Sequence, residues 1–124
     1  MIPLLYLAAF MAVAVGFAHS YLGERHILMR LLRRHDLPKL FGDQTFTAHT
    51  LRFAWHVTTL AWWGFAAIIV LIARQALSVQ SVAWVLASTF LLTAAVTFIV
   101  SRGRHLAWPV FAFIGGVCML AALG

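Results

Sequence analysis

Four long apolar runs, separated by short polar stretches, dominate the pattern of hydrophobic and polar positions along the chain. They cover roughly residues 2–22, 53–73, 79–100 and 106–123. Each run is close to the ~20 residues that an α-helix needs to cross ~30 Å of hydrocarbon. The runs are apolar on every side, whereas the strands of a membrane barrel alternate polar with apolar residues. The pattern therefore predicts an all-α chain, an integral membrane four-helix bundle with up-down topology.

The polar residues that flank these runs set the expected ends of the helices. We expect helices over about 2–22 with a cytoplasmic extension to about 34, over 44–73, over 79–100 and over 105–123, all in a single domain of residues 1–124. In the extension, leucines and Ile27 alternate with arginines at near-helical spacing, as in a segment that lies at the membrane interface. Asp43 or Thr45 is expected to cap the second helix.

Small and hydroxyl side chains recur at four-residue intervals on two of the predicted helices, with Val85 as the only gap on the third helix. The first helix carries Ala8, Ala12, Gly16 and Ser20, and the third carries Ser81, Thr89, Thr93, Thr97 and Ser101. Small residues allow a neighbouring backbone to approach closely, and hydroxyl groups in lipid usually face a helix partner or a polar site.

Composition and charge support a membrane protein and orient it. Of the 124 residues 64% are hydrophobic, and the mean hydropathy is +0.96, which is too apolar for a soluble domain. Eight of the nine basic residues flank the first and third connections, and only Arg74 lies in the second. The positive-inside rule then places both termini on the non-cytoplasmic side of a bacterial cell inner membrane. We expect the basic residues to attract anionic headgroups rather than nucleic acid.

The histidines provide the one pattern that suggests chemistry, because all six fall in the predicted cytoplasmic half. His19 and His26 are seven residues apart, as are His49 and His56. Seven residues make about two helical turns, so both members of a pair face one way. On antiparallel helices His19 is expected level with His56 and His26 level with His49, with His105 arriving from a later connection.

A redox or metal-handling membrane protein is the leading hypothesis from this pattern. His19 and His56 are expected to lie about a turn inside the apolar region, where polar side chains usually face a bundle or cavity. They are the candidate ligands of a haem. A bare iron, copper or zinc ion would instead recruit a larger set: His19, His26, His49, His56, His105 and Glu24. Hydrolysis is disfavoured because no serine, cysteine or aspartate accompanies the histidines as a nucleophile.

In its four-helix architecture and inward histidines the chain resembles small membrane b-type cytochromes, and its histidine-rich face resembles membrane di-iron oxidases and hydroxylases. The resemblance implies a membrane oxidoreductase with iron or haem. The paired histidine boxes of the hydroxylases are absent, so no residue is carried over from either family.

Other hypotheses account for the same residues. His19 and His56 are also suited to taking up protons in a small proton-coupled transporter or channel that acts as a homo-oligomer. A third hypothesis is that the chain is an accessory subunit of a larger membrane complex. In a purely structural role the two rings bond to Ser20, Thr59, Thr97 or a backbone carbonyl, Glu24 pairs with Arg25, Arg52 or Arg104, and Asp43 caps a helix. The lone Cys118 forms no intrachain disulfide.

Overall fold

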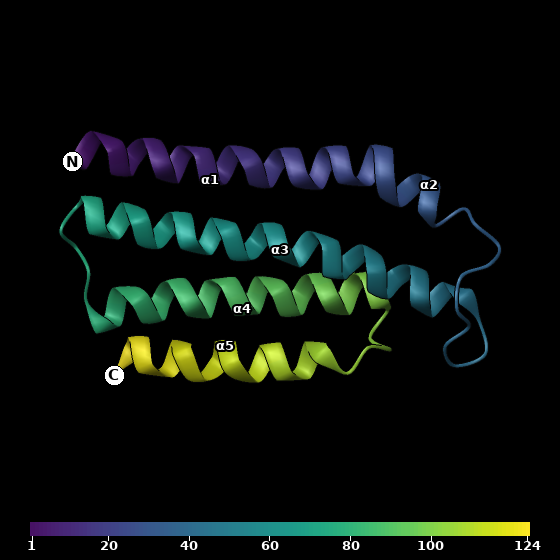
Figure 1. Ribbon diagram of the computed structural model, residues 1–124. Coiled ribbons are helices and arrows are strands. Elements are labelled where there is room, and N and C mark those ends of the chain that lie inside the picture. The colour runs from purple at the N-terminus through teal and green to yellow at the C-terminus, as the bar shows by residue number, and fades with distance from the viewer.

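The computed structural model describes residues 1–124 and consists of four long helices joined by short connections (Figure 1). The elements are α1 (Ile2–Leu22), the π-helix η1 (Gly23–Leu28), α2 (Met29–Leu31), α3 (Gln44–Ala73), α4 (Val79–Ser101) and α5 (Ala107–Leu123). The prediction of an all-α chain with four helices is confirmed. The extension of the first helix ends at Leu31, earlier than expected.

Local sequence explains where the helices after α1 begin and end. The Asp43 carboxylate accepts a hydrogen bond from the backbone N–H of Phe46 at 3.0 Å, which caps α3 as predicted. Ser78 and Ser81 form a reciprocal capping box at the start of α4. At the end of α4 the backbone turns through Arg102 and Gly103, both with positive φ, and leads into α5.

The four helices lie side by side in the order α1, α3, α4, α5 (Figure 1). Helix α1 packs on α3 alone and α5 packs on α4 alone, since no Cα atom of α1 comes within 8 Å of α4 or α5. The result is an open row of helices, in which α3 and α4 form the middle. Most fully buried side chains are therefore alanines and small hydroxyl residues at the helix contacts.

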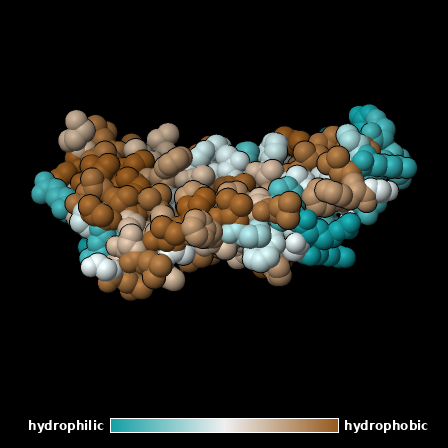
Figure 2. Space-filling view, turned by 90° about the horizontal axis from the view of Figure 1, so that it is seen from below, coloured by the Kyte–Doolittle hydropathy of each residue, from teal (hydrophilic) through white to brown (hydrophobic).

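Length and composition identify a membrane protein. The helical segments Ile2–Leu31, Gln44–Ala73 and Val79–Ser101 are long and apolar enough to span a bilayer, and α5 is a shorter apolar helix. Large apolar side chains such as Phe10, Phe65 and Phe113 are more than half exposed, as expected where lipid is the solvent. The largest hydrophilic area gathers at the end that holds α2 and the start of α3 (Figure 2). Both termini lie at the other end (Figure 1).

Two glycine–tryptophan contacts hold α1 against α3. Trp63 lies over Gly16 and donates from Nε1 to the carbonyl oxygen of Val13 at 3.3 Å. Trp55 lies over Gly23 at the start of η1, where a Cβ atom would collide with the indole ring. Trp63 is too deep for an interfacial belt, and its role is this close interhelical contact.

Candidate functional site

His56 of α3 lies between two side chains contributed by the first helical segment. Its Nδ1 atom is 2.9 Å from Oγ of Ser20 in α1, and its Nε2 atom is 3.2 Å from Oε2 of Glu24 in η1. Arg52, one turn earlier on α3, holds the same carboxylate with Nη2 at 2.9 Å from Oε1 and Nε at 3.2 Å from Oε2. The imidazole and the carboxylate are only partly buried, with side chains 27% and 31% exposed.

Spacing of four residues on each helix produces this arrangement. Ser20 and Glu24 are four apart on one segment, and Arg52 and His56 are four apart on the other. Residues four apart share a helix face, so two such pairs meet when the helices run antiparallel. The π-helical turn begins at Gly23, directly before Glu24. Isolated π-helical turns occur frequently at functional sites.

A chain of hydroxyl groups extends the site deeper between α1 and α3. Oγ of Ser20 is 2.7 Å from Oγ1 of Thr59, and Thr59 donates to the carbonyl oxygen of Gly16 at 3.2 Å. Thr59 is buried, with 3% of its surface exposed. The polar groups thus form one continuous line from Arg52 through Glu24, His56, Ser20 and Thr59 to the backbone of α1 at Gly16.

Two arrangements of hydrogen atoms satisfy these contacts, because the distances leave open which atom donates at Ser20 and at His56. A carbonyl oxygen only accepts, and a hydroxyl group has one hydrogen to donate. If Thr59 donates to Gly16, then Ser20 donates to Thr59 and Nδ1 of His56 donates to Ser20. A hydrogen bond between Nε2 and Glu24 then needs a further proton, either on the imidazole or on the carboxyl group.

Removal of that proton reverses the line. A neutral imidazole that donates from Nε2 to the Glu24 carboxylate must accept at Nδ1. Ser20 then donates to His56, Thr59 donates to Ser20, and the Gly16 carbonyl oxygen loses its donor. Donation from Thr59 to the Gly16 carbonyl oxygen therefore accompanies the arrangement that holds the additional proton.

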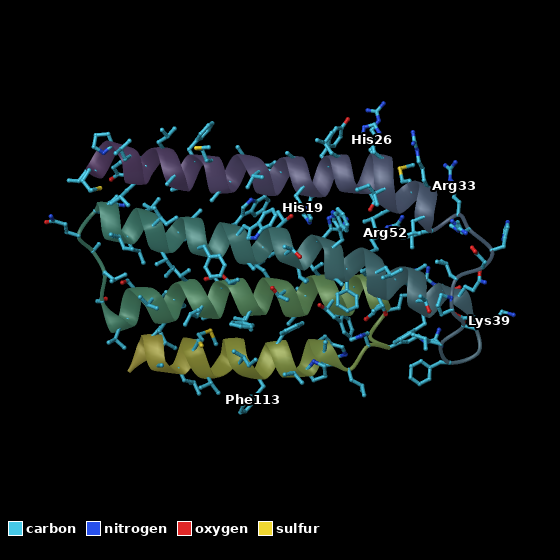
Figure 3. All side chains as sticks on the ribbon, viewed as in Figure 1. His19, His26, Arg33, Lys39, Arg52 and Phe113 are labelled. Atoms are coloured by element: carbon cyan, nitrogen blue, oxygen red, sulfur yellow. The ribbon has the colours of Figure 1, made fainter.

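His19 faces α3 beside this line but uses different partners. Its ring stacks on the indole of Trp55 with centroids 4.6 Å apart and lies 4.9 Å from the ring of Trp62. Nε2 of His19 donates to the carbonyl oxygen of Trp55 at 3.3 Å, and Nε1 of Trp55 donates to that of His19 at 3.0 Å. Figure 3 shows His19 and Arg52 between α1 and α3.

The other histidines lie apart from His56. His26 is exposed and points away from α3 (Figure 3), so the predicted rung with His49 does not form. His49 lines a cavity beside Arg52, and His35 is exposed in the connection before α3. Nδ1 of His105 accepts from the backbone N–H of Ala107 at 3.1 Å, and its ring packs on Phe46 and Phe53 of α3.

The predicted metal ligands are not gathered into one cluster. Nowhere in the chain do three or more histidine, cysteine, aspartate or glutamate side chains converge in a way that holds a metal ion. Of the six expected ligands, only His56 and Glu24 are in hydrogen-bond contact. Haem ligation by His19 and His56 stays a prediction, and it would require both rings to leave protein partners that they now hold.

Ser20, His56 and Glu24 also line up in the order of a hydrolytic triad, which the sequence did not predict. The sequence predicted no serine placed as a nucleophile beside a histidine, so the surroundings of Ser20 decide whether it can act as one. The surroundings do not fit acyl transfer, because Ser20 lies inside a helix whose N–H groups are committed to helical hydrogen bonds. No free pair of backbone donors is thus available to stabilise an oxyanion.

The chain has no significant similarity to a protein-family model, to a curated protein or to a solved structure.

Proposed function

We propose that the protein is a small proton-coupled transporter or channel of the bacterial inner membrane, which acts as a homo-oligomer. The single observation that carries this proposal is the imidazole of His56, hydrogen-bonded at both nitrogens between Glu24 and Ser20. Histidine is the side chain whose charge ordinarily changes between about pH 5 and 8. Ionisable residues within membrane segments commonly serve proton relays and substrate pathways.

The line of hydroxyl groups links the proton to the packing of two helices. Gain of the proton at His56 allows Thr59 to donate to the Gly16 backbone, and its loss withdraws that donor. Gly16 is also the position at which the indole of Trp63 leaves no room for a Cβ atom. Protonation of His56 thereby stabilises one fit of α1 against α3, which is the coupling that a proton-driven conformational change requires.

The open row of helices supports action as an oligomer. Within one chain the hydroxyl groups of Thr89 and Thr93 donate to carbonyl oxygens of their own helix, so they do not extend the polar line along α4. Glu24 and His56 keep about 30% of their side-chain surface exposed. A second copy of the chain that packs against the exposed side chains of Glu24 and His56 would enclose the polar line between α1 and α3, which a single chain leaves open to its surroundings.

Proton flux into liposomes tests the proposal. The purified protein is reconstituted around a pH-sensitive dye, and flux is measured in steps between about pH 5 and 8, where histidine ordinarily titrates. We expect flux that changes with pH and falls to the level of empty liposomes in His56→Ala. His35→Ala is the matched control, because it removes an exposed histidine of the connection before α3.

Two results would contradict the proposal. One is wild-type protein that conducts neither protons nor any solute tested under a pH gradient. The other is flux that persists unchanged in His56→Ala. Thr59→Val adds a second readout, because it keeps the imidazole and the carboxylate but removes the hydroxyl that connects them to Gly16. We expect its flux to depend less steeply on pH than that of the wild type.

A further inference from the structure

A groove runs between α2, the connection that follows it and the first turns of α3. It consists of two adjoining cavities of about 330 and 390 Å³, which share Leu32, Arg33 and Ala48 in their walls. The first cavity is completed by Met29, His49 and Arg52. We call this feature the α2–α3 groove.

Arg33 is the cation of the groove that lacks an anionic partner. It forms no ion pair, whereas Arg52 is held by Glu24 and Arg34 by Asp36. The hydrogen bonds from Arg34 lower the pKa of Asp36 to about 2, so that carboxylate stays committed to Arg34. An arginine without a carboxylate partner beside a groove is suited to a singly or doubly charged oxyanion such as phosphate, because the planar guanidinium can bind two of its oxygens.

Apolar side chains line the groove beside Arg33, where the first membrane segment ends. Met29 and Leu32 come from the same segment as Arg33, and the membrane-spanning segment Ile2–Leu31 ends between them. A ligand there meets arginine on the water side and hydrocarbon on the lipid side. This combination matches a phospholipid, whose phosphate is joined to a glycerol and two acyl chains, better than a free phosphate ion.

We propose that the α2–α3 groove binds the phosphate of one anionic phospholipid, with Arg33 as its main cationic contact and Met29 and Leu32 against the glycerol and upper acyl chains. The site is discrete, in contrast to the general attraction of a basic surface for a negative leaflet. It does not depend on the proton site at His56.

Native mass spectrometry of the detergent-purified protein tests the site. Phosphatidylglycerol or phosphatidylcholine is added at equal concentration, and the fraction of protein that retains one lipid is measured. We expect preferential retention of one phosphatidylglycerol. Arg33→Gln should weaken it by about tenfold, as for loss of one charged hydrogen-bonding contact. Arg30→Gln is the matched control, because Arg30 is an exposed arginine three residues away that does not line the groove.

A variant that fills the groove tests the need for its space separately from the need for the charge of Arg33. Ala48 lies in both cavities, so Ala48→Phe fills the groove and leaves every charge in place. We expect it to lose the retained lipid as Arg33→Gln does. Equal loss in Arg30→Gln and Arg33→Gln, or equal retention of the two lipids, would overturn the proposal. Displacement of phosphatidylglycerol by millimolar inorganic phosphate would instead identify a free-phosphate site and would also overturn it.

Discussion

Two hydroxyl groups, those of Ser20 and Thr59, connect the imidazole of His56 to the backbone of α1 at Gly16. The sequence predicted Ser20 as a possible partner of the His56 ring and Arg52 as a possible partner of Glu24, and both contacts are present. Thr59 was expected beside an imidazole, but it bonds to Ser20 and to the Gly16 carbonyl oxygen instead. It did not predict that one carboxylate, Glu24, would serve both Arg52 and His56. Helical spacing shows which residues share a face, but the facing register of two helices depends on packing that a single sequence does not reveal.

The glycine beneath Trp55 offers a residue-level prediction. Gly23→Ala places a methyl group inside the volume of the indole ring, which itself donates to the His19 carbonyl oxygen. We expect a loss of about 1–3 kcal/mol in the free energy of unfolding, as for other overpacked contacts. Thermal unfolding in detergent, followed by tryptophan fluorescence, measures the change.

Gly116 in α5 is the matched control for that substitution. A Cβ atom there meets nothing within 4 Å. Gly116→Ala should leave stability unchanged or raise it by up to about 1 kcal/mol, because alanine is the better helix former. Equal destabilisation by the two substitutions would show that the contact with Trp55 is not the cause.

Among the elements, the helices were predictable and the π-helical turn was not. The predicted bounds of α3 coincide with the observed Gln44–Ala73, because Asp43 is a strong cap and the apolar run that follows is long. The segment Gly23–Leu28 has ordinary helical composition, and nothing local marks its wider turn. Its position coincides with tertiary contacts of Gly23 and Glu24 with α3, which no local pattern encodes.

The cap of α3 offers a prediction at the scale of the element. The backbone N–H of Phe46 lowers the pKa of Asp43 below its ordinary value of 3.8. The carboxylate therefore stabilises the folded state above that ordinary value, and the contribution is lost as the pH falls through the lowered pKa. Asp43→Ala should have a lower Tm than the wild type at pH 7, and the difference should shrink at acid pH.

Asp43→Asn keeps the hydrogen-bond acceptor at that cap but removes the negative charge. Asparagine keeps an oxygen that accepts from the Phe46 N–H, so its Tm at pH 7 should lie closer to that of the wild type. Calorimetry of both variants across the pH range measures the effect. A Tm difference for Asp43→Ala that grows at low pH would contradict the assignment.

At the scale of the whole molecule, charge and topology predict how the row of helices sits in the membrane. Arg33, Lys39 and the other basic residues of that end should face the cytoplasm, with both termini on the opposite side. In a Cys118→Ser background, Lys39→Cys and Leu77→Cys report the two ends. In intact spheroplasts a membrane-impermeant maleimide should label Leu77→Cys alone, and lysis should be required for Lys39→Cys. The reverse labelling would invert the predicted orientation.

The unequal lengths of the helices have a mechanical consequence for the surrounding lipid. Helix α3 has 30 residues and α5 has 17. At ~1.5 Å per residue these correspond to about 45 and 26 Å. Helix α1 with its extension, at one edge of the row, and α3 beside it are therefore longer than α5, which forms the other edge (Figure 1). The first turns of α3 carry His49 and Arg52 and are expected to project beyond the hydrocarbon, whereas α5 is shorter than the ~30 Å that it must cross. The bilayer next to α5 is therefore expected to thin, so local membrane thickness should bias where the protein accumulates.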